Sequence, residues 1–129
     1  AGGLPTAAVI DMFTSGDVKL LSLSDAEINA LIKKYPWYFK FTIPKGTYKG
    51  QDQDVQTVAV ANVLIVREDL PEDLVYNLVK ALYDHRDVLI NAHKAAEDFK
   101  LEDGLKGITG VVDLHPGAAR FFKEKGVLK

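Results

Sequence analysis

Two short stretches of this sequence hold residues that could bind a small anion. The first is AGGLPT, in which Gly3, Pro5 and Thr6 stand directly ahead of an apolar run. Glycine lets a backbone approach a ligand closely, and the first N–H groups of a helix are unpaired and attract negative charge. A carboxylate or phosphate could bind there, and Thr6 could add a hydroxyl donor. A tight turn that leads into a helix explains the same residues, and the motif alone favours that interpretation.

The second stretch is IPKGTYKGQDQDVQT (43–57), a polar segment that continues without a break into an apolar strand. Pro44 and Gly46 favour a turn, and Tyr48 offers an aromatic face with a polar tip. One interpretation is a surface loop that caps the strand. The other is a linker beside a cleft, with Tyr48 and Thr57 turned toward a ligand. Spacing does not choose between them.

Residues suited to catalysis or metal binding are scattered. His85 and His93 are separated by eight positions across an expected helix break, which is poor ligand geometry. His115, ahead of Pro116, is expected to satisfy local backbone groups at a helix start. No GxSxG, HExxH, P-loop or GxGxxG pattern occurs, and the sequence contains no cysteine. We therefore predict no metal site, no cofactor and no enzymatic activity.

Composition fits one soluble α/β domain. A length of 129 residues permits a real hydrophobic core, and the net charge of -2 gives no reason to expect nucleic acid as a partner. No stretch approaches the roughly 18 consecutive apolar residues that a membrane span requires. Because the start lacks an initiator Met and a signal-peptide pattern, we expect a processed chain or a fragment.

Two helices are predicted in the first part of the chain. Residues 7–13 supply an apolar helical body, with Pro5 in its first turn and Gly16 as its stop signal. Ser24 and Glu27 then form a capping-box pattern ahead of a second helix.

Three strands are predicted around these helices. Residues 18–23 resemble a short buried strand, and residues 38–43 alternate between apolar and polar side chains, which is typical of a half-exposed strand. Residues 58–66 are mainly apolar on both faces, which favours a central strand covered on both sides.

Helices dominate the rest. A long helix is predicted within residues 69–90, and a shorter one over residues 91–99. Pro116 starts a last helix with Ala119 and Phe122 facing inward, and Phe121 is a further candidate for that face. The buried stripe of the long helix is expected to consist of Leu74, Val75, Leu78, Val79 and Leu82. This order fits an α/β architecture whose sheet lacks some of its strands within this chain.

Four segments occur together in this order: GGLP, YPWYFKFTIPKGTYKGQDQDVQTVAV, DLPEDLVYNLVKALYDHRDVLINAHKAA and LHPGAARFFKEKG. In combination they resemble the TAXI family, the extracytoplasmic solute receptors of one class of TRAP transporters. The resemblance extends over essentially the whole chain and corresponds to the C-terminal half of such a receptor.

The resemblance implies part of a type II periplasmic-binding-protein fold. In this three-layer αβα fold, two lobes close around a solute by a hinge motion. On that template, residues 1–46 belong to the second lobe, residues 47–57 form the inter-lobe crossing or hinge, and residues 58–129 supply a first-lobe strand and helices.

The resemblance also implies a ligand and partners. Gly3, Pro5 and Thr6 match the cleft-facing helix start of the family, and Tyr48 matches the Tyr of its GTY-GQ segment; with Thr57 these are the predicted ligand-binding residues. Members are associated with dicarboxylates, 2-oxoglutarate or glutamate-like solutes. The intact parent is then expected to be periplasmic and to deliver a small anionic solute to TRAP permease membrane subunits.

The rival interpretation is a free-standing α/β interaction or regulatory domain without a transport role. A small hydrolase is a third and weaker interpretation. It would need a nucleophile clustered with a base, and His85, His93 and His115 give no sign of such a cluster. If the neighbours of strand 58–66 lie outside this chain, its apolar faces would be exposed. The chain is then expected to self-associate, swap elements or repack.

Overall fold

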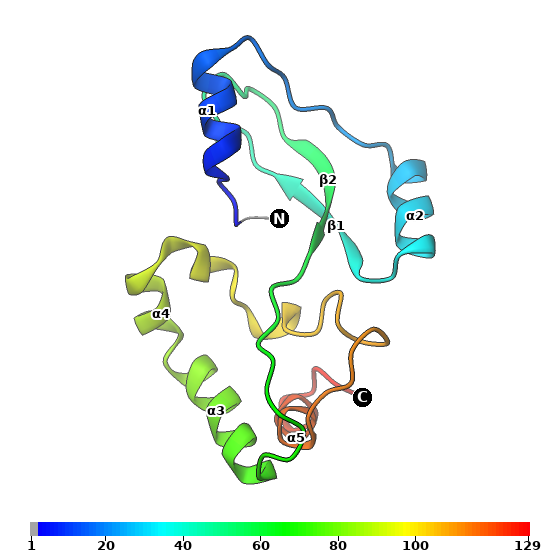
Figure 1. Ribbon diagram of the computed structural model, residues 1–129, viewed down its shortest axis with the longest axis vertical. Helices are drawn as coiled ribbons and strands as arrows, with labels where there is room; N and C mark the ends of the chain where they lie inside the picture. Colours follow the sequence, from blue (N-terminus) through cyan, green and yellow to red (C-terminus); the bar gives the residue numbers. More distant parts are fainter. Residues whose placement is uncertain (1–2) are drawn as a thin grey trace. The chain divides into compact units, whose positions relative to one another are not determined.

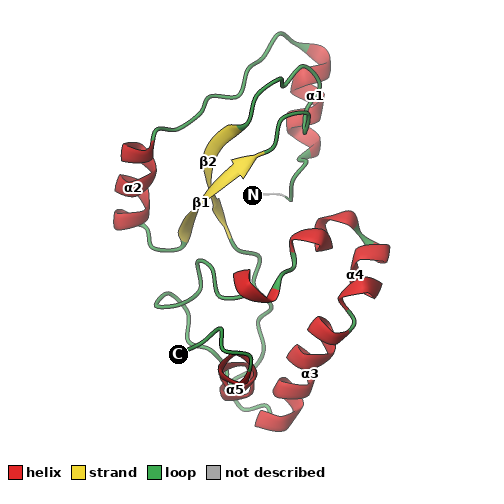
Figure 2. Cartoon of the chain, turned by 180° about the vertical axis from the view of Figure 1, so that it is seen from behind, coloured by secondary structure: helices red, strands yellow, loops and turns green. Residues whose placement is uncertain are grey.

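The computed structural model describes residues 3–129 and divides the chain into two compact units, with the boundary in the sequence between Ala61 and Asn62. The first unit contains two helices and a two-stranded sheet, and the second is helical (Figures 1 and 2). The mixed α/β composition is the predicted one. Among the described residues, no helix has the length and apolar character needed to span a membrane.

The sheet of the first unit is an antiparallel hairpin of β1 (Tyr38–Ile43) and β2 (Val55–Val60). In β1 the more buried positions alternate with exposed ones from Phe39 onward, which confirms the strand predicted there. Phe41 stands opposite Thr57, and directly opposed residues of an antiparallel pair share one face. Thr57 therefore lies on the apolar face of the hairpin.

The strand predicted over residues 18–23 is absent, and an extended segment runs beside β2 in its place. The N–H of Leu23 donates to the carbonyl oxygen of Gln56 at 2.8 Å, but the N–H of Gln56 donates to the hydroxyl of Ser22, also at 2.8 Å. Because a side-chain hydroxyl takes the place of a backbone carbonyl, no ladder propagates.

Helix α2 (Asp25–Lys34) has the predicted capping box. The Ser24 hydroxyl accepts from the Glu27 N–H at 3.3 Å, and the Glu27 carboxylate accepts from the Ser24 N–H at 2.7 Å. The hydrogen bond from the Ser24 side chain, followed by the one from its backbone, lowers the pKa of Glu27. Asp25 joins the helix to the hairpin, since it accepts from Lys40 at 2.7 Å and from Gln56 at 2.9 Å. These two bonds, Lys40 first, lower the pKa of Asp25.

The predicted strand 58–66 is wrong in extent. Observed pairing starts at Val55 and ends at Val60, opposite the first residue of β1. Beyond that point the chain stays irregular through Val66. A ladder needs a neighbour that satisfies its N–H and C=O groups, and the described residues supply none there. The apolar pattern predicted which residues can form a strand. It did not predict which of them have a neighbouring strand to pair with.

The second unit is built on two packed helices, α3 (Glu72–Asp84) and α5 (Pro116–Glu124). Val75 and Phe121 form the centre of the contact, with exposed fractions of 2% and 0%. The inward-facing pair Phe121 and Phe122 is as predicted. The predicted stripe on α3 is only partly correct, because Leu74 remains 51% exposed and Leu78 is exposed as well.

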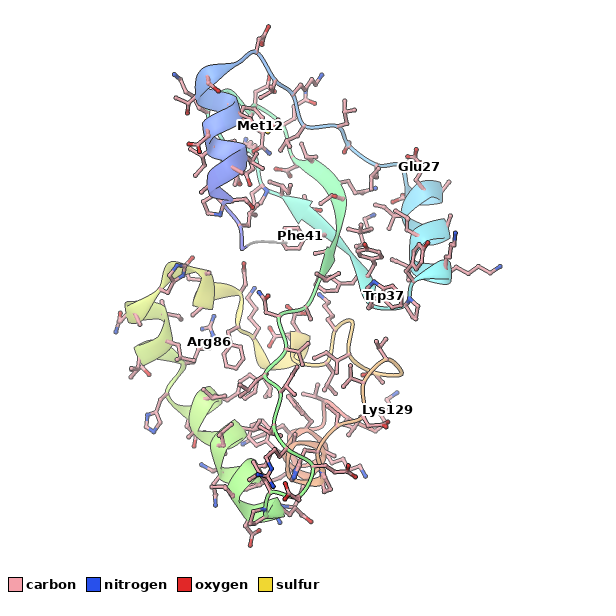
Figure 3. The ribbon with its side chains drawn as sticks, viewed as in Figure 1. Met12, Glu27, Trp37, Phe41, Arg86 and Lys129 are labelled. Carbon is pink, nitrogen blue, oxygen red and sulfur yellow. The ribbon has the colours of Figure 1, made fainter. Side chains whose placement is uncertain are left out.

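The predicted long helix is interrupted at His85, which separates α3 from α4 (Arg86–Ala92). Two short 3₁₀ helices follow, η1 (Lys94–Asp98) and η2 (Leu101–Asp103), where a single helix over 91–99 was expected. Arg86 (Figure 3) holds this region against α4 by donating to the carbonyl oxygens of Phe99 and Glu97, both at 2.5 Å.

Aromatic rings fill the space between these helices. Tyr83 stacks on Phe99, with ring centroids 4.5 Å apart, and on Phe121, at 5.4 Å. Burial raises the pKa of the Tyr83 phenol, and the nearby charge of Glu102 adds to the shift. An offset stack of this kind adds about 0.5–1.5 kcal/mol per pair beyond the burial of area.

His115 has the local backbone role predicted for it. Its Nδ1 accepts from the N–H of Gly117 at 3.1 Å, and its Nε2 lies 3.1 Å from the carbonyl oxygen of Leu70. The neutral ring with its hydrogen on Nε2 satisfies both contacts. His115 thus caps α5 and ties it to the segment ahead of α3.

Gly117→Ala should destabilise the second unit. A Cβ at this position would lie 2.2 Å from the carbonyl oxygen of Glu72 and 2.7 Å from the N of Tyr76, both backbone atoms of the facing segment. Because these atoms cannot move without shifting α3, we expect a loss of about 1–3 kcal/mol in unfolding free energy. Urea denaturation followed by circular dichroism measures it.

Gly16→Ala is the matched control. Its nearest neighbour would be the carbonyl oxygen of Met12 at an ordinary 3.5 Å, so we expect a change within about 0.5 kcal/mol. Equal denaturation midpoints for both variants would contradict the close approach of α5 to α3.

Candidate functional site

The start of α1 (Ala7–Ser15) is joined to the loop between β1 and β2 by a hydrogen bond between distant residues. The backbone N–H of Thr6, the N-cap residue, donates to the hydroxyl of Tyr48 at 3.1 Å. The bond spans 42 positions in the sequence. Tyr48 is only 5% exposed, so its hydroxyl is held in a restricted position at the helix start.

A stacked aromatic pair supports the same contact. The rings of Phe13 and Tyr48 lie 5.4 Å apart and are nearly parallel, at 9°. Phe13 follows Thr6 by two helical turns, so both lie on one side of α1. Tyr48 therefore contacts the helix at two levels, its ring against Phe13 and its hydroxyl against the Thr6 N–H. Figure 2 shows the loop that carries Tyr48 running beside α1.

Gln51 organises the loop around Tyr48. Its side-chain oxygen accepts from the Tyr48 N–H at 3.2 Å, and its backbone N–H donates to the Tyr48 carbonyl at 3.1 Å. Its side-chain NH₂ group lies within hydrogen-bond distance of three loop carbonyls, those of Ile43, Pro44 and Gln53. One side chain thus replaces the backbone pairing that an irregular loop lacks.

Two glycines and a carboxylate complete the loop. Gly46 and Gly50 have φ values of +77° and +78°, in the left-handed region that other residues rarely adopt. The Asp54 carboxylate accepts from the Lys45 N–H at 2.8 Å. The exposed Asp54, just before β2, therefore helps to close the loop through its carboxylate.

At the start of α1, two backbone donors have no acceptor among the described residues. The N–H groups of Val9 and Ile10 both donate to the Thr6 carbonyl at 3.0 Å, whereas those of Ala7 and Ala8 have no acceptor among residues 3–129. Both alanines are exposed. The Thr6 hydroxyl does not cap the helix, because it donates to the Gly3 carbonyl at 3.1 Å. The positive end of the helix dipole is thus open to an anion.

The structure brings some of the predicted site residues together and leaves one apart. Thr6 and Tyr48 are in direct contact, and Gly3 joins them through the Thr6 hydroxyl. Pro5 lies just before the N-cap and not in the first turn as predicted, because Thr6 is extended, with φ and ψ of -94° and 127°. Thr57 lies within β2, and no side-chain hydrogen bond links it to Thr6 or Tyr48 in the described part of the chain.

Sequence reasoning missed the supporting residues Phe13 and Gln51. The sequence pattern places Phe13 in the apolar body of the helix and Gln51 among other polar loop residues. The spacing of seven between Thr6 and Phe13 was the available signal, since it places an aromatic ring two turns below the free N–H groups. Within residues 3–129, no three or more His, Cys, Asp or Glu side chains gather in a way that could hold a metal ion.

A protein-family model described as the NMT1-like family matches residues 1–126, nearly the whole sequence. The matched region includes the start of α1, the Tyr48 loop and α5, and so extends over both units.

Tyr48→Phe should weaken the attachment of α1 while leaving the Phe13 stack in place. Removing the hydroxyl leaves the Thr6 N–H without its acceptor, which we expect to lower the unfolding free energy of the first unit by about 0.5–1.5 kcal/mol. Urea denaturation followed by Trp37 fluorescence measures this, because Trp37 is the only tryptophan and lies in the same unit.

Tyr38→Phe is the control for loss of a phenolic hydroxyl. Tyr38 is half-buried, and its hydroxyl has no hydrogen-bond partner within the described residues. We expect a change below about 0.5 kcal/mol. If both variants shift the midpoint equally, the Thr6 contact does not stabilise the unit.

Proposed function

Because the chain belongs to the NMT1-like family, whose members are periplasmic-binding-protein-like, we propose that it is part of a TAXI-type receptor for a small anionic solute. The family supports an extracytoplasmic solute-binding role and a membrane transporter as partner. The proposal adds the solute class (dicarboxylate, 2-oxoglutarate or glutamate-like) and a TRAP permease as the acceptor. It places the intact parent in the periplasm.

The observation that carries the proposal is the open start of α1. A carboxylate placed there can accept from the N–H groups of Ala7 and Ala8, which have no acceptor among the described residues. The Tyr48 hydroxyl accepts from Thr6 and still has its own hydrogen to donate. Three donors would then converge on one carboxylate, and hydrogen bonds to a charged group are worth about 1.5–3 kcal/mol each.

The chemistry of this site favours an anion over a cation or a neutral sugar. Backbone N–H groups and a phenol present hydrogens, and the helix dipole adds positive potential. A cation would find no carboxylate among Gly3, Pro5, Thr6 and Tyr48. The methyl side chains of Ala7 and Ala8 leave their backbone accessible.

The lobe assignment is part of the same proposal. Residues 1–46 would supply the second lobe, residues 47–57 the crossing or hinge, and residues 58–129 a strand and helices of the first lobe. The exposed apolar side chains of Leu64 and Ile65 support this assignment, because a central strand of a larger sheet is covered on both faces. Thr57 is proposed to meet the solute only when the lobes close.

The same exposed apolar side chains favour a second candidate function, that of a free-standing interaction domain. Such a domain would bind a protein through this surface and would not respond to small acids. The two candidates therefore differ in what the start of α1 does, and this can be measured directly.

The test is titration of the isotopically labelled chain with succinate, 2-oxoglutarate and glutamate, followed by the backbone amide signals. We expect saturable shifts centred on Thr6, Ala7 and Ala8, reduced by added salt. Dimethyl succinate, which carries no charge, should produce none. Affinity should be low, because half a cleft buries little of the solute. Shifts absent from these residues with all three acids would overturn the proposal in favour of the interaction domain.

Ala7→Pro is the sharpest variant for this site. Proline is favoured at the first helical position, and the extended Thr6 ahead of it has backbone angles that suit a residue before proline. The helix should persist while one of the free donors disappears. We expect the affinity for the acids to fall at least about tenfold, which corresponds to loss of a hydrogen bond to a charged group worth about 1.5 kcal/mol. An unchanged affinity would exclude the Ala7 N–H from the site.

A further inference from the structure

All four polar groups of Gln51 form hydrogen bonds within the loop between β1 and β2. Its backbone N–H donates to the Tyr48 carbonyl at 3.1 Å, and its backbone carbonyl accepts from the Gly46 N–H at 2.9 Å. Its side-chain oxygen accepts from the Tyr48 N–H at 3.2 Å, and its NH₂ group lies 3.0–3.3 Å from three loop carbonyl oxygens. A glutamine that only solvated the loop would direct its amide to water, so Gln51 has an internal role.

The backbone of Tyr48 depends on this one residue. Among residues 3–129, the Tyr48 N–H has the Gln51 side chain as its acceptor, and the Tyr48 carbonyl accepts from the Gln51 N–H. The ring is placed separately, by its stack on Phe13 at 5.4 Å. Loss of the Gln51 amide would leave the Tyr48 N–H without its acceptor and the three loop carbonyls without their shared donor.

The Tyr48 hydroxyl is the group whose position this loop controls. Its oxygen accepts from the Thr6 N–H at 3.1 Å, and its hydrogen has no acceptor in the described part of the chain. Tyr48 is 5% exposed, so the hydroxyl is confined beside the start of α1. A bond from this hydroxyl to a carboxylate needs a separation of about 2.5–3.0 Å, and a small displacement of the ring would therefore lose it.

We propose that Gln51 is a positioning residue for the solute site. It fixes the Tyr48 backbone so that the phenolic hydroxyl meets both the Thr6 N–H and a carboxylate of the solute. This role rests on the proposed function, since it requires that the start of α1 receives an anion. Gln51 acts through Tyr48, because its own NH₂ group already faces loop carbonyls. A loop that is ordered before the solute arrives lowers the entropic cost of binding.

The contacts require a donor and an acceptor on one side chain. A glutamate could accept from the Tyr48 N–H, but it would place an oxygen without a hydrogen against the loop carbonyls. Gln51→Met keeps the length of the side chain, removes these bonds and adds no charge near the site. Gln53→Met is the matched control, because the Gln53 side chain is exposed and forms no hydrogen bond within the described residues, and the variant keeps the backbone carbonyl that Gln51 contacts.

Amide hydrogen exchange at Thr6 tests the positioning in the absence of solute. The Thr6 N–H exchanges when its bond to the Tyr48 hydroxyl opens. We expect Gln51→Met to raise its exchange rate at least about fivefold, and Gln53→Met to leave it unchanged. Unchanged exchange at the buried Ile28, in the same unit, checks that the unit stays folded. Equal Thr6 rates in the natural chain and in Gln51→Met would overturn the positioning role.

A double-mutant cycle with Tyr48→Phe tests whether Gln51 acts through the phenolic hydroxyl. Succinate affinity is measured from amide shifts in the natural chain, both single variants and the double variant. We expect Gln51→Met to weaken binding at least about threefold in the natural chain and to have little further effect in Tyr48→Phe, because the donor that it positions is already absent. A role in stability alone would give equal losses in both backgrounds, and that result would overturn the proposal.

The two proposals fail in different ways. A natural chain whose amide signals respond to none of the three acids would overturn the proposed function, and the role of Gln51 at a solute site with it. Saturable binding that Gln51→Met leaves unchanged would overturn the role of Gln51 alone.

Discussion

The packing of the first unit depends on two contacts that Tyr48 makes with α1, one at Thr6 and one at Phe13. None of the residues Ala7–Ser15 is itself buried, so this helix has little core of its own. Its attachment comes from a ring stacked on Phe13 and a hydroxyl that accepts from the Thr6 N–H. The loop can offer Tyr48 in this position because Gln51 bonds to both its N–H and its carbonyl. The Tyr48 side chain thus links the helix to the loop of the hairpin.

The same contact leaves the helix start chemically open. A serine or threonine cap usually satisfies a first-turn donor with its own hydroxyl. Thr6 uses its hydroxyl on the Gly3 carbonyl instead, and Tyr48 satisfies only the Thr6 N–H. The donors of Ala7 and Ala8 remain without a partner in the described structure. The bond that holds the helix is therefore next to the groups that we propose bind the solute, and a change to Tyr48 should affect both stability and binding.

The second unit is held together by the packing of α5 against α3. Gly117 allows α5 to approach the backbone of α3 closely. Phe121 of α5 then stacks on Tyr83 of α3. That small core leaves the outer side of α3 and the segment Asn62–Val66 uncovered. In the proposed receptor this segment belongs to a larger sheet, whose neighbouring strands would cover its apolar side chains.

The sequence by itself determined the features whose partners lie a few residues apart. The capping box of Ser24 and Glu27 and the role of His115 were predictable, because the interacting atoms are joined by a short stretch of chain. The motifs in their order also predicted a solute-binding receptor, and the NMT1-like family match confirms this prediction at the level of a periplasmic-binding-protein-like family. Only the tertiary structure decided that Tyr48 meets Thr6 and that pairing stops at Val60. Both depend on which distant segment is present to satisfy a backbone group, and no local pattern carries that information.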